Sequence, residues 1–94
     1  MIFQAGPKAE VIKSKMTHSM ETHALTVVRQ IFNRYKSQYD VAKRITEAME
    51  EEYGGSWSCI VGPGTYSNIL HYEDNCYIIF KLEDIKIVLA KSKS

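Results

Sequence analysis

The chain is predicted to fold as an α+β domain, with two helices on one face of an antiparallel sheet. Apolar residues recur at helical spacing between residues 17 and 53, and they alternate at strand spacing between residues 56 and 90. Glycine, proline and acidic turn signals separate these segments. Because helices that precede a run of strands are typical of α+β domains, we expect the order β-α-α-β-β-β-β.

The length of 94 residues fits one small domain. We expect residues 9–91 to form it, between a flexible N-terminal segment (residues 1–8) and a flexible C-terminus (residues 92–94). A domain of this size buries only roughly 60 to 65% of the surface of its unfolded chain, so a monomer is only modestly stable. Oligomerisation would therefore be an advantage.

The charge pattern favours neither nucleic acid nor membrane as a partner. The formal net charge is +1, and acidic and basic residues are interspersed, so no basic patch is evident. The apolar runs are too short to span a bilayer, and the first residues lack a signal-peptide pattern. We expect a cytoplasmic protein in which the two cysteines, Cys59 and Cys76, stay reduced.

The first strand and the first helix are expected before residue 36. A short apolar centre predicts a strand over residues 9–14. A broad apolar stripe then predicts an amphipathic helix from Thr17 to Tyr35, with Thr17 or Ser19 as its N-cap.

The second helix is expected from Ser37 to Tyr53. Ser37 and Asp40 have capping-box spacing at its start, and Gly54 follows its end. The acidic run at residues 50–52 lies in the last turn and is expected on a solvated face, with a docking surface for a basic partner as the alternative.

Four strands are expected in the second half of the chain. The strand over residues 65–72 carries polar side chains on both faces, a pattern typical of an edge strand whose backbone a partner can pair with. The next strand is apolar on both faces and is expected at the centre of the sheet. The four ranges are 56–61, 65–72, 76–82 and 85–90.

Catalytic and metal-binding patterns are weak in this sequence. Cys59 and His71 lie on neighbouring predicted strands, and a buried apolar thiol is the simpler interpretation of Cys59. His18 and His23 are five residues apart and fall on different sides of a helix, so no metal spacing results. No cofactor is expected, and recognition through the backbone is better supported than catalysis.

The chain resembles the small dynein light chain family. The resemblance covers essentially the whole chain from about Ala9, with one-residue gaps near Glu10 and around residues 73–76. The segment from Trp57 to Gly62, W-x-C-I-V-G, is its most specific part. The other residues that carry it are Val11 to Lys13, Met16, Met20, Tyr35, Asp40, Ala42, Tyr53, Ser67, His71 and Leu82 to Lys91.

The resemblance implies a non-enzymatic homodimer in the cytoplasm, associated with the cytoskeleton. In that family the strand that matches residues 65–72 crosses to complete the sheet of the second protomer. Partner proteins, among them the dynein intermediate chain and others with short linear motifs, add an extended segment beside it by β-augmentation. Two such grooves on one dimer bind two chains together.

Matching positions also imply the site residues. Trp57, Ser58, Thr65, Ser67 and Ile69 are expected at the dimer interface. Gln38 and Tyr39 are expected to contribute to the groove of the other protomer. The remaining groove residues are expected to be Lys13, Thr65, Tyr66, Ser67, Asn68, Ile69, Leu70, His71, Tyr77 and Ile79.

Two departures from the family pattern leave alternatives open. Tyr66 and Lys81 stand where family members have glycine and tyrosine, so a specialised structural subunit with a remodelled groove for one partner is the first alternative. A small thiol enzyme that uses Cys59 and His71 is a remote second one. Ser58 replaces a family histidine that makes dimerisation sensitive to acid, and we expect that switch to be absent.

Overall fold

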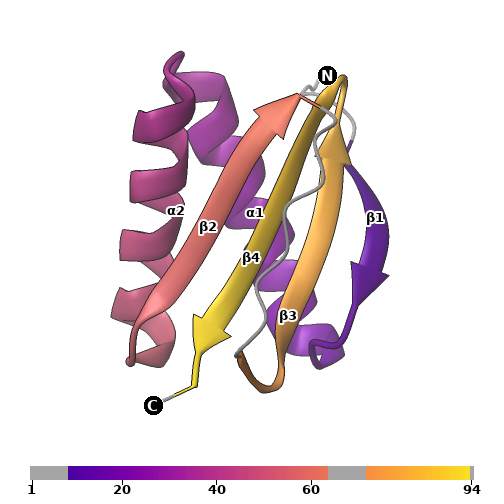
Figure 1. The fold of residues 1–94 in the computed structure, drawn as a ribbon, viewed down its shortest axis with the longest axis vertical. Coiled ribbons are helices and arrows are strands. Elements are labelled where there is room, and N and C mark those ends of the chain that lie inside the picture. The colour runs from indigo at the N-terminus through magenta and orange to yellow at the C-terminus, as the bar shows by residue number, and fades with distance from the viewer. Residues whose placement is uncertain (1–8, 64–71, 94) are drawn as a thin grey trace, which may run out of the picture.

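The computed structural model describes residues 9–63 and 72–93. Within these residues, two helices pack on the same face of a four-stranded antiparallel sheet (Figure 1). The elements are β1 (Ala9–Ser14), α1 (His18–Arg34), α2 (Gln38–Tyr53), β2 (Trp57–Pro63), β3 (Tyr72–Leu82) and β4 (Ile85–Ser92). The α+β class and the placement of both helices on one face are therefore confirmed.

Polar side chains define where both helices begin. The Thr17 hydroxyl accepts a hydrogen bond from the Met20 amide at 3.3 Å, so Thr17 rather than Ser19 is the N-cap of α1. Ser37 caps α2 in the same way, since its hydroxyl accepts from the Asp40 amide at 3.4 Å. Gly54 ends α2 with a φ of 72°, a conformation that glycine adopts without strain.

The strands lie in the order β1-β3-β4-β2, so β3 and β4 are central and β1 and β2 are the edges. The predicted strand over residues 65–72 lies outside the described residues except for Tyr72, which is the first residue of β3. The prediction that the central strand begins at Cys76 was wrong. The strand begins at Tyr72, and the acidic segment before Cys76 lies inside β3 as an irregularity in which Asn75 has a φ of 64°.

The main core lies between the helices and the sheet. Its side chains come from alternate positions of the strands and from the inner stripes of both helices, as a two-layer domain requires. Its buried members are Ala24, Val28, Val41, Ile45, Met49, Trp57, Ile78, Phe80, Leu82, Ile87 and Leu89. Along the part of the chain that is described, no helix is long and apolar enough to cross a membrane.

Glu50 corrects the prediction for the acidic run. Glu51 and Glu52 are exposed as expected, but Glu50 is half-buried and its Oε2 accepts a hydrogen bond from the Trp57 amide at 3.1 Å. The Trp57 indole N–H donates to the Gly54 carbonyl, also at 3.1 Å. Glu50 therefore joins the end of α2 to the start of β2, a role that the sequence did not indicate.

Candidate partner-binding face

A second apolar cluster lies on the sheet face that points away from the helices. Tyr77, Val88 and Ala90 are its buried members, with exposed fractions of 3%, 1% and 0%. Half-buried Ile60, Tyr72 and Ile79 pack against them. We call the sheet face that bears these six residues the outer face.

Strand β4 shows why the outer face matters. Ile87 and Leu89 pack into the main core, whereas Val88 and Ala90 belong to the outer-face cluster, so four consecutive residues are buried. Strands that are buried on both faces occur in sheets with a layer on each side. The two helices provide one layer, and no helix or strand among the described residues provides the other.

A bulge in β1 turns two lysines onto the outer face. Val11 pairs with Phe80 and packs against the main core, and the register then shifts so that Lys13 pairs with Ile79. In a regular strand, Lys13 would share the core-facing side of Val11 because side chains alternate. The bulge thus places both Lys13 and Lys15 on the outer face and leaves Ile12 50% exposed.

An irregularity in β3 likewise turns Tyr72 onto the outer face. Tyr72 pairs with Ser92 and Tyr77 pairs with Ala90, so β3 has three residues more than β4 over this stretch. Residues five apart in a regular strand point to opposite faces. Here the two rings instead stack on the same face, with centroids 4.5 Å apart and an interplanar angle of 21°.

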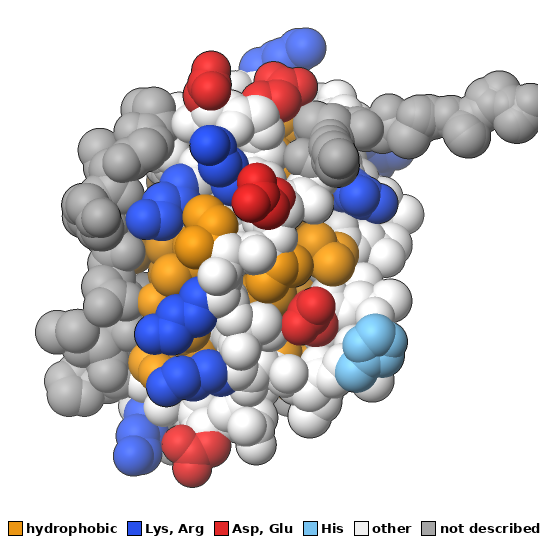
Figure 2. All heavy atoms as spheres, turned by 90° about the vertical axis from the view of Figure 1, so that its right-hand side faces the viewer, with side chains coloured by type: hydrophobic (Ala, Val, Ile, Leu, Met, Phe, Trp, Pro, Cys, Tyr) orange, Lys and Arg blue, Asp and Glu red, His pale blue; other side chains and the backbone are white. Residues whose placement is uncertain are grey.

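The two lysines and the two tyrosines form one cluster, which we call the lysine–tyrosine cluster. The Lys15 Nζ donates to the Tyr72 hydroxyl at 3.2 Å and lies 5.7 Å from the centre of its ring. The Lys13 Nζ lies 5.9 Å from the centre of the Tyr77 ring. Figure 2 looks at the β1 side of the molecule, where basic side chains lie next to hydrophobic ones.

The hydroxyl of Tyr77 responds to this environment. Burial raises the pKa of Tyr77, and the neighbouring Tyr72 adds to the rise, whereas the positive charge of Lys15 opposes it. Tyr77 therefore stays protonated at neutral pH and its hydroxyl remains able to donate a hydrogen bond.

Three of the expected groove residues are brought together on this face. Lys13, Tyr77 and Ile79 lie on adjacent strands β1 and β3, and Lys13 pairs with Ile79 in the sheet register. Lys15 and Tyr72 were not expected in the site. Tyr72 and Tyr77 are five residues apart, a spacing that predicts opposite faces of a regular strand. The sequence pattern therefore gave no sign of the irregularity that brings both rings onto one face.

Gln38 and Tyr39 lie far from that cluster, at the start of α2. Tyr39 is 73% exposed, an unusual exposure for a large aromatic side chain. With Cys59 of β2 it borders a hollow of about 250 Å³. These residues therefore lie beside the β2 edge of the sheet, where the arrangement in Figure 1 also places α2.

The expected interface residues fall into three groups. Trp57 is only 5% exposed and belongs to the main core. Ser58 alternates with it in β2, and its hydroxyl hydrogen-bonds that of Ser92 at 3.3 Å. The other expected interface and groove residues, Thr65, Tyr66, Ser67, Asn68, Ile69, Leu70 and His71, lie outside the described residues.

Cys59 is poorly suited to nucleophilic catalysis. Its half-buried side chain packs against the main core, and desolvation raises the pKa of its thiol to about 12. A thiol with this pKa is protonated at neutral pH, whereas the thiolate is the reactive form. Over residues 9–63 and 72–93, no group of three or more His, Cys, Asp or Glu could hold a metal ion.

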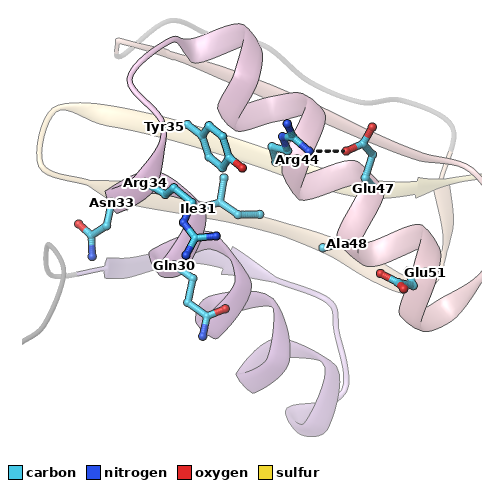
Figure 3. A pocket seen from close by; sticks show the side chains of 9 residues that line it. All are labelled: Gln30, Ile31, Asn33, Arg34, Tyr35, Arg44, Glu47, Ala48 and Glu51. Carbon is cyan, nitrogen blue, oxygen red and sulfur yellow. Dashed lines mark ion pairs between the residues drawn. The ribbon is translucent and has the colours of Figure 1, made fainter.

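A larger hollow of about 760 Å³ lies on the helical side, between the end of α1 and α2 (Figure 3). Its charges are mixed, with Arg34 and Arg44 near Glu47 and Glu51. Arg44 already has partners there, because it lies 3.7 Å from Glu47 and its guanidinium is 5.0 Å from the centre of the Tyr35 ring. This hollow has no connection with the outer face.

Known proteins resemble this chain in sequence and in fold. It is 25% identical over 84 residues to a probable cytoplasmic dynein light chain 2 of Caenorhabditis elegans, with 89% of this chain and 92% of that protein covered. It is 23% identical over 79 residues to cytoplasmic dynein light chain 1 of Saccharomyces cerevisiae, with 84% of this chain and 85% of that protein covered.

Solved structures have the same fold. The dynein light chain-like domain of the Fasciola hepatica calcium binding protein FhCaBP2 superposes with a TM-score of 0.79 at 20% identity, over 93% of each chain. The corresponding domain of CsTAL3 gives a TM-score of 0.74 at 16% identity, over 97% of this chain and 100% of that domain. Both are dynein light chain-like domains of proteins that are not themselves named dynein light chains.

The family model gives the assignment. The model of dynein light chain type 1 matches residues 8–92, which is nearly the whole chain. This match agrees with the two-helix, four-strand fold and with the distant cytoplasmic relatives. The chain belongs to the dynein light chain type 1 family.

Proposed function

We propose that this chain is a non-enzymatic dynein light chain that forms a homodimer and binds short extended segments of partner proteins. The partners would include motor-complex subunits such as a dynein intermediate chain, at the cytoskeleton in the cytoplasm. Binding would occur by β-augmentation, in which main-chain hydrogen bonds supply affinity and alternate side chains supply specificity.

The observation that carries the proposal is the apolar outer face. Val88 and Ala90 are buried on the side of β4 that neither helix covers. A second protomer that packs on this face would supply the second layer that a sheet apolar on both faces requires.

The β2 edge supports a dimer independently. β2 is the last strand in the sheet order, so one side of its backbone has no strand neighbour within the described sheet. Unpaired edges attract further strands and are usually covered. The exposed Tyr39 lies on the same side, where a strand of a second protomer could contact it.

The test is a titration of the labelled protein with a dynein intermediate chain segment, followed by NMR. We expect shifts of the amides of residues 67–71 and of Lys13, because these line the proposed groove. A protein that stays monomeric, or whose amides do not respond to any partner segment, would refute the proposal.

The specialised-subunit alternative is favoured by Lys81. This lysine is exposed and pairs in register with Lys86, so two cations face each other where family members have a tyrosine on β3. A pull-down with Tyr66→Gly beside the wild type separates the two functions. Gained binding of classical family motifs by the variant would indicate a remodelled groove, whereas equal binding would favour the general hub.

A further inference from the structure

We propose that the lysine–tyrosine cluster, on the β1 side of the outer face, selects acidic partner segments, in which two Asp or Glu residues two positions apart bind Lys13 and Lys15. This inference rests on the proposed function, because it specifies the chemistry of the segment that the groove binds. The lysine–tyrosine cluster carries it.

The cluster depends on two separate backbone irregularities. The bulge after Val11 brings Lys13 and Lys15 onto the outer face, and the irregularity before Tyr77 brings Tyr72 beside it. β-Bulges re-aim side chains and are frequent beside functional sites. Here the irregularities in the neighbouring strands β1 and β3 bring their side chains together in one cluster.

The charge of the outer face favours an anionic occupant. Alternation along the strands places four lysines on it, Lys13, Lys15, Lys81 and Lys86, together with Glu10. Glu73 and Asp74 lie in the irregular part of β3. Lys13 and Lys15 form no ion pair within 4.0 Å with another residue of the ranges 9–63 and 72–93, where the ion pair Arg44 to Glu47 lies in the helical layer.

The positions of the two ammonium groups are defined by the tyrosines. Lys15 is hydrogen-bonded to the Tyr72 hydroxyl, and each lysine lies over one ring of the stacked pair. Cation–π contact restricts the long lysine side chains before a ligand arrives, which lowers the entropy lost on binding. The two remaining donors of the Lys15 ammonium group are available to a carboxylate.

The spacing of the lysines defines the spacing of the acids. Residues two apart in an extended strand are separated by roughly 6.6 to 6.8 Å, and their side chains point to the same face. An extended segment that lies over the lysine–tyrosine cluster has the same repeat. A pattern of Asp or Glu, any residue, Asp or Glu would therefore bring one carboxylate to each lysine, with charge-assisted hydrogen bonds.

The experiment uses a phage library of random 12-residue peptides, selected on the wild-type 94-residue chain. We expect the enriched peptides to carry two acidic residues two positions apart. The tightest peptide is then synthesised in two forms, acidic and with Asn or Gln in place of the acids, and both are titrated by fluorescence anisotropy.

Substitutions of the two lysines then test whether Lys13 and Lys15 cause the acidic preference. Each lysine should contribute about twofold to fivefold in affinity, so Lys13→Ala with Lys15→Ala should weaken the acidic peptide about tenfold and leave the amide form nearly unchanged. Lys13→Arg with Lys15→Arg should keep the acidic preference. The control, Arg29→Ala with Arg34→Ala in α1, removes the same charge from the helical layer and should keep wild-type affinity.

The outcomes separate this inference from the function on which it rests. The acidic preference alone would be overturned if the enriched peptides lacked acidic pairs. It would also be overturned if the lysine variant lost affinity equally for the acidic and the amide peptide. If no peptide is enriched although the protein is folded and dimeric, peptide binding itself is wrong, and the acidic preference falls with it.

Discussion

The two faces of the sheet differ in how their apolar side chains are covered. On the inner face, Phe80 and Ile78 are fully buried beneath α1 and α2. On the outer face, Tyr77 and Val88 are equally buried, but no described helix or strand lies over them, and lysines surround them. The inner face is thus covered by the chain's own helices, whereas we propose that a second copy of this chain covers the outer face.

The residue types follow this difference. Apart from Trp57, whose indole N–H donates to the Gly54 carbonyl, the buried side chains of the inner face are aliphatic residues, Met49 and Phe80, which have no N–H or O–H groups to satisfy. The outer face uses Tyr72 and Tyr77, which combine a large apolar ring with a hydroxyl and are enriched at interfaces for that reason. We therefore expect substitutions on the inner face to change folding, and those on the outer face to change association.

The largest expected effect is from Phe80→Ala, which opens a cavity in the fully buried core. It should lower the free energy of unfolding by about 3 to 5 kcal/mol. Its neighbour Ile79, half-buried on the outer face, should cost about 1 to 2 kcal/mol when replaced by alanine. Urea denaturation at equal protein concentration measures both, and equal losses would contradict the distinction between the faces.

A smaller effect is expected where the helical layer is joined to β2. Glu50→Ala removes the carboxylate that accepts from the Trp57 amide and should cost about 1.5 to 2 kcal/mol. The matched control, Glu51→Ala, removes the same charge from an exposed position and should change stability by less than about 0.5 kcal/mol. Thermal unfolding of both variants is the measurement. Similar melting temperatures would show that the hydrogen bond contributes little.

The smallest effect concerns the Cys59 thiol on the inner side of β2. Its folded-state pKa of about 12 lies above the ordinary value of 9.0, so the folded state keeps the proton that the unfolded state loses. This contribution to stability is complete below pH 9 and is lost as pH rises from 9 towards 12. The wild type should therefore lose more stability than Cys59→Ala between pH 8 and pH 10.5, measured by urea midpoints. Identical losses would show that the thiol is not desolvated.

Local patterns predicted most of the inner layer. Helical spacing, the caps Thr17 and Ser37 and the terminating Gly54 are local features, and the structure confirms them. Strand β1 was expected at residues 9–14, where it is found. The resemblance to a family then supplied what periodicity alone could not, the expectation that the sheet is completed by a partner.

Features that depend on long-range pairing were harder to predict. The bulge at Ile12 and the irregularity around Asn75 arise from the register between β1, β3 and β4, which no single strand encodes. Lys15 and Tyr72 were therefore absent from the expected site. Glu50 was assigned to a solvated run because its partner, the Trp57 amide, follows only after the turn at Gly54.

The central claim is that the outer face and the β2 edge are completed by a second copy of this chain. Sedimentation equilibrium at pH 7 tests it most directly, with Ile60→Glu as the comparison, since this substitution places a charge within the outer-face cluster.

We predict a species of twice the 10.8 kDa chain mass for the wild type at micromolar concentration. It should persist at pH 5, because Ser58 stands where the family has its acid-sensitive histidine. Ile60→Glu should be a folded monomer, with association weakened by about a hundredfold or more. A wild type that sediments as a folded 10.8 kDa monomer would contradict the account.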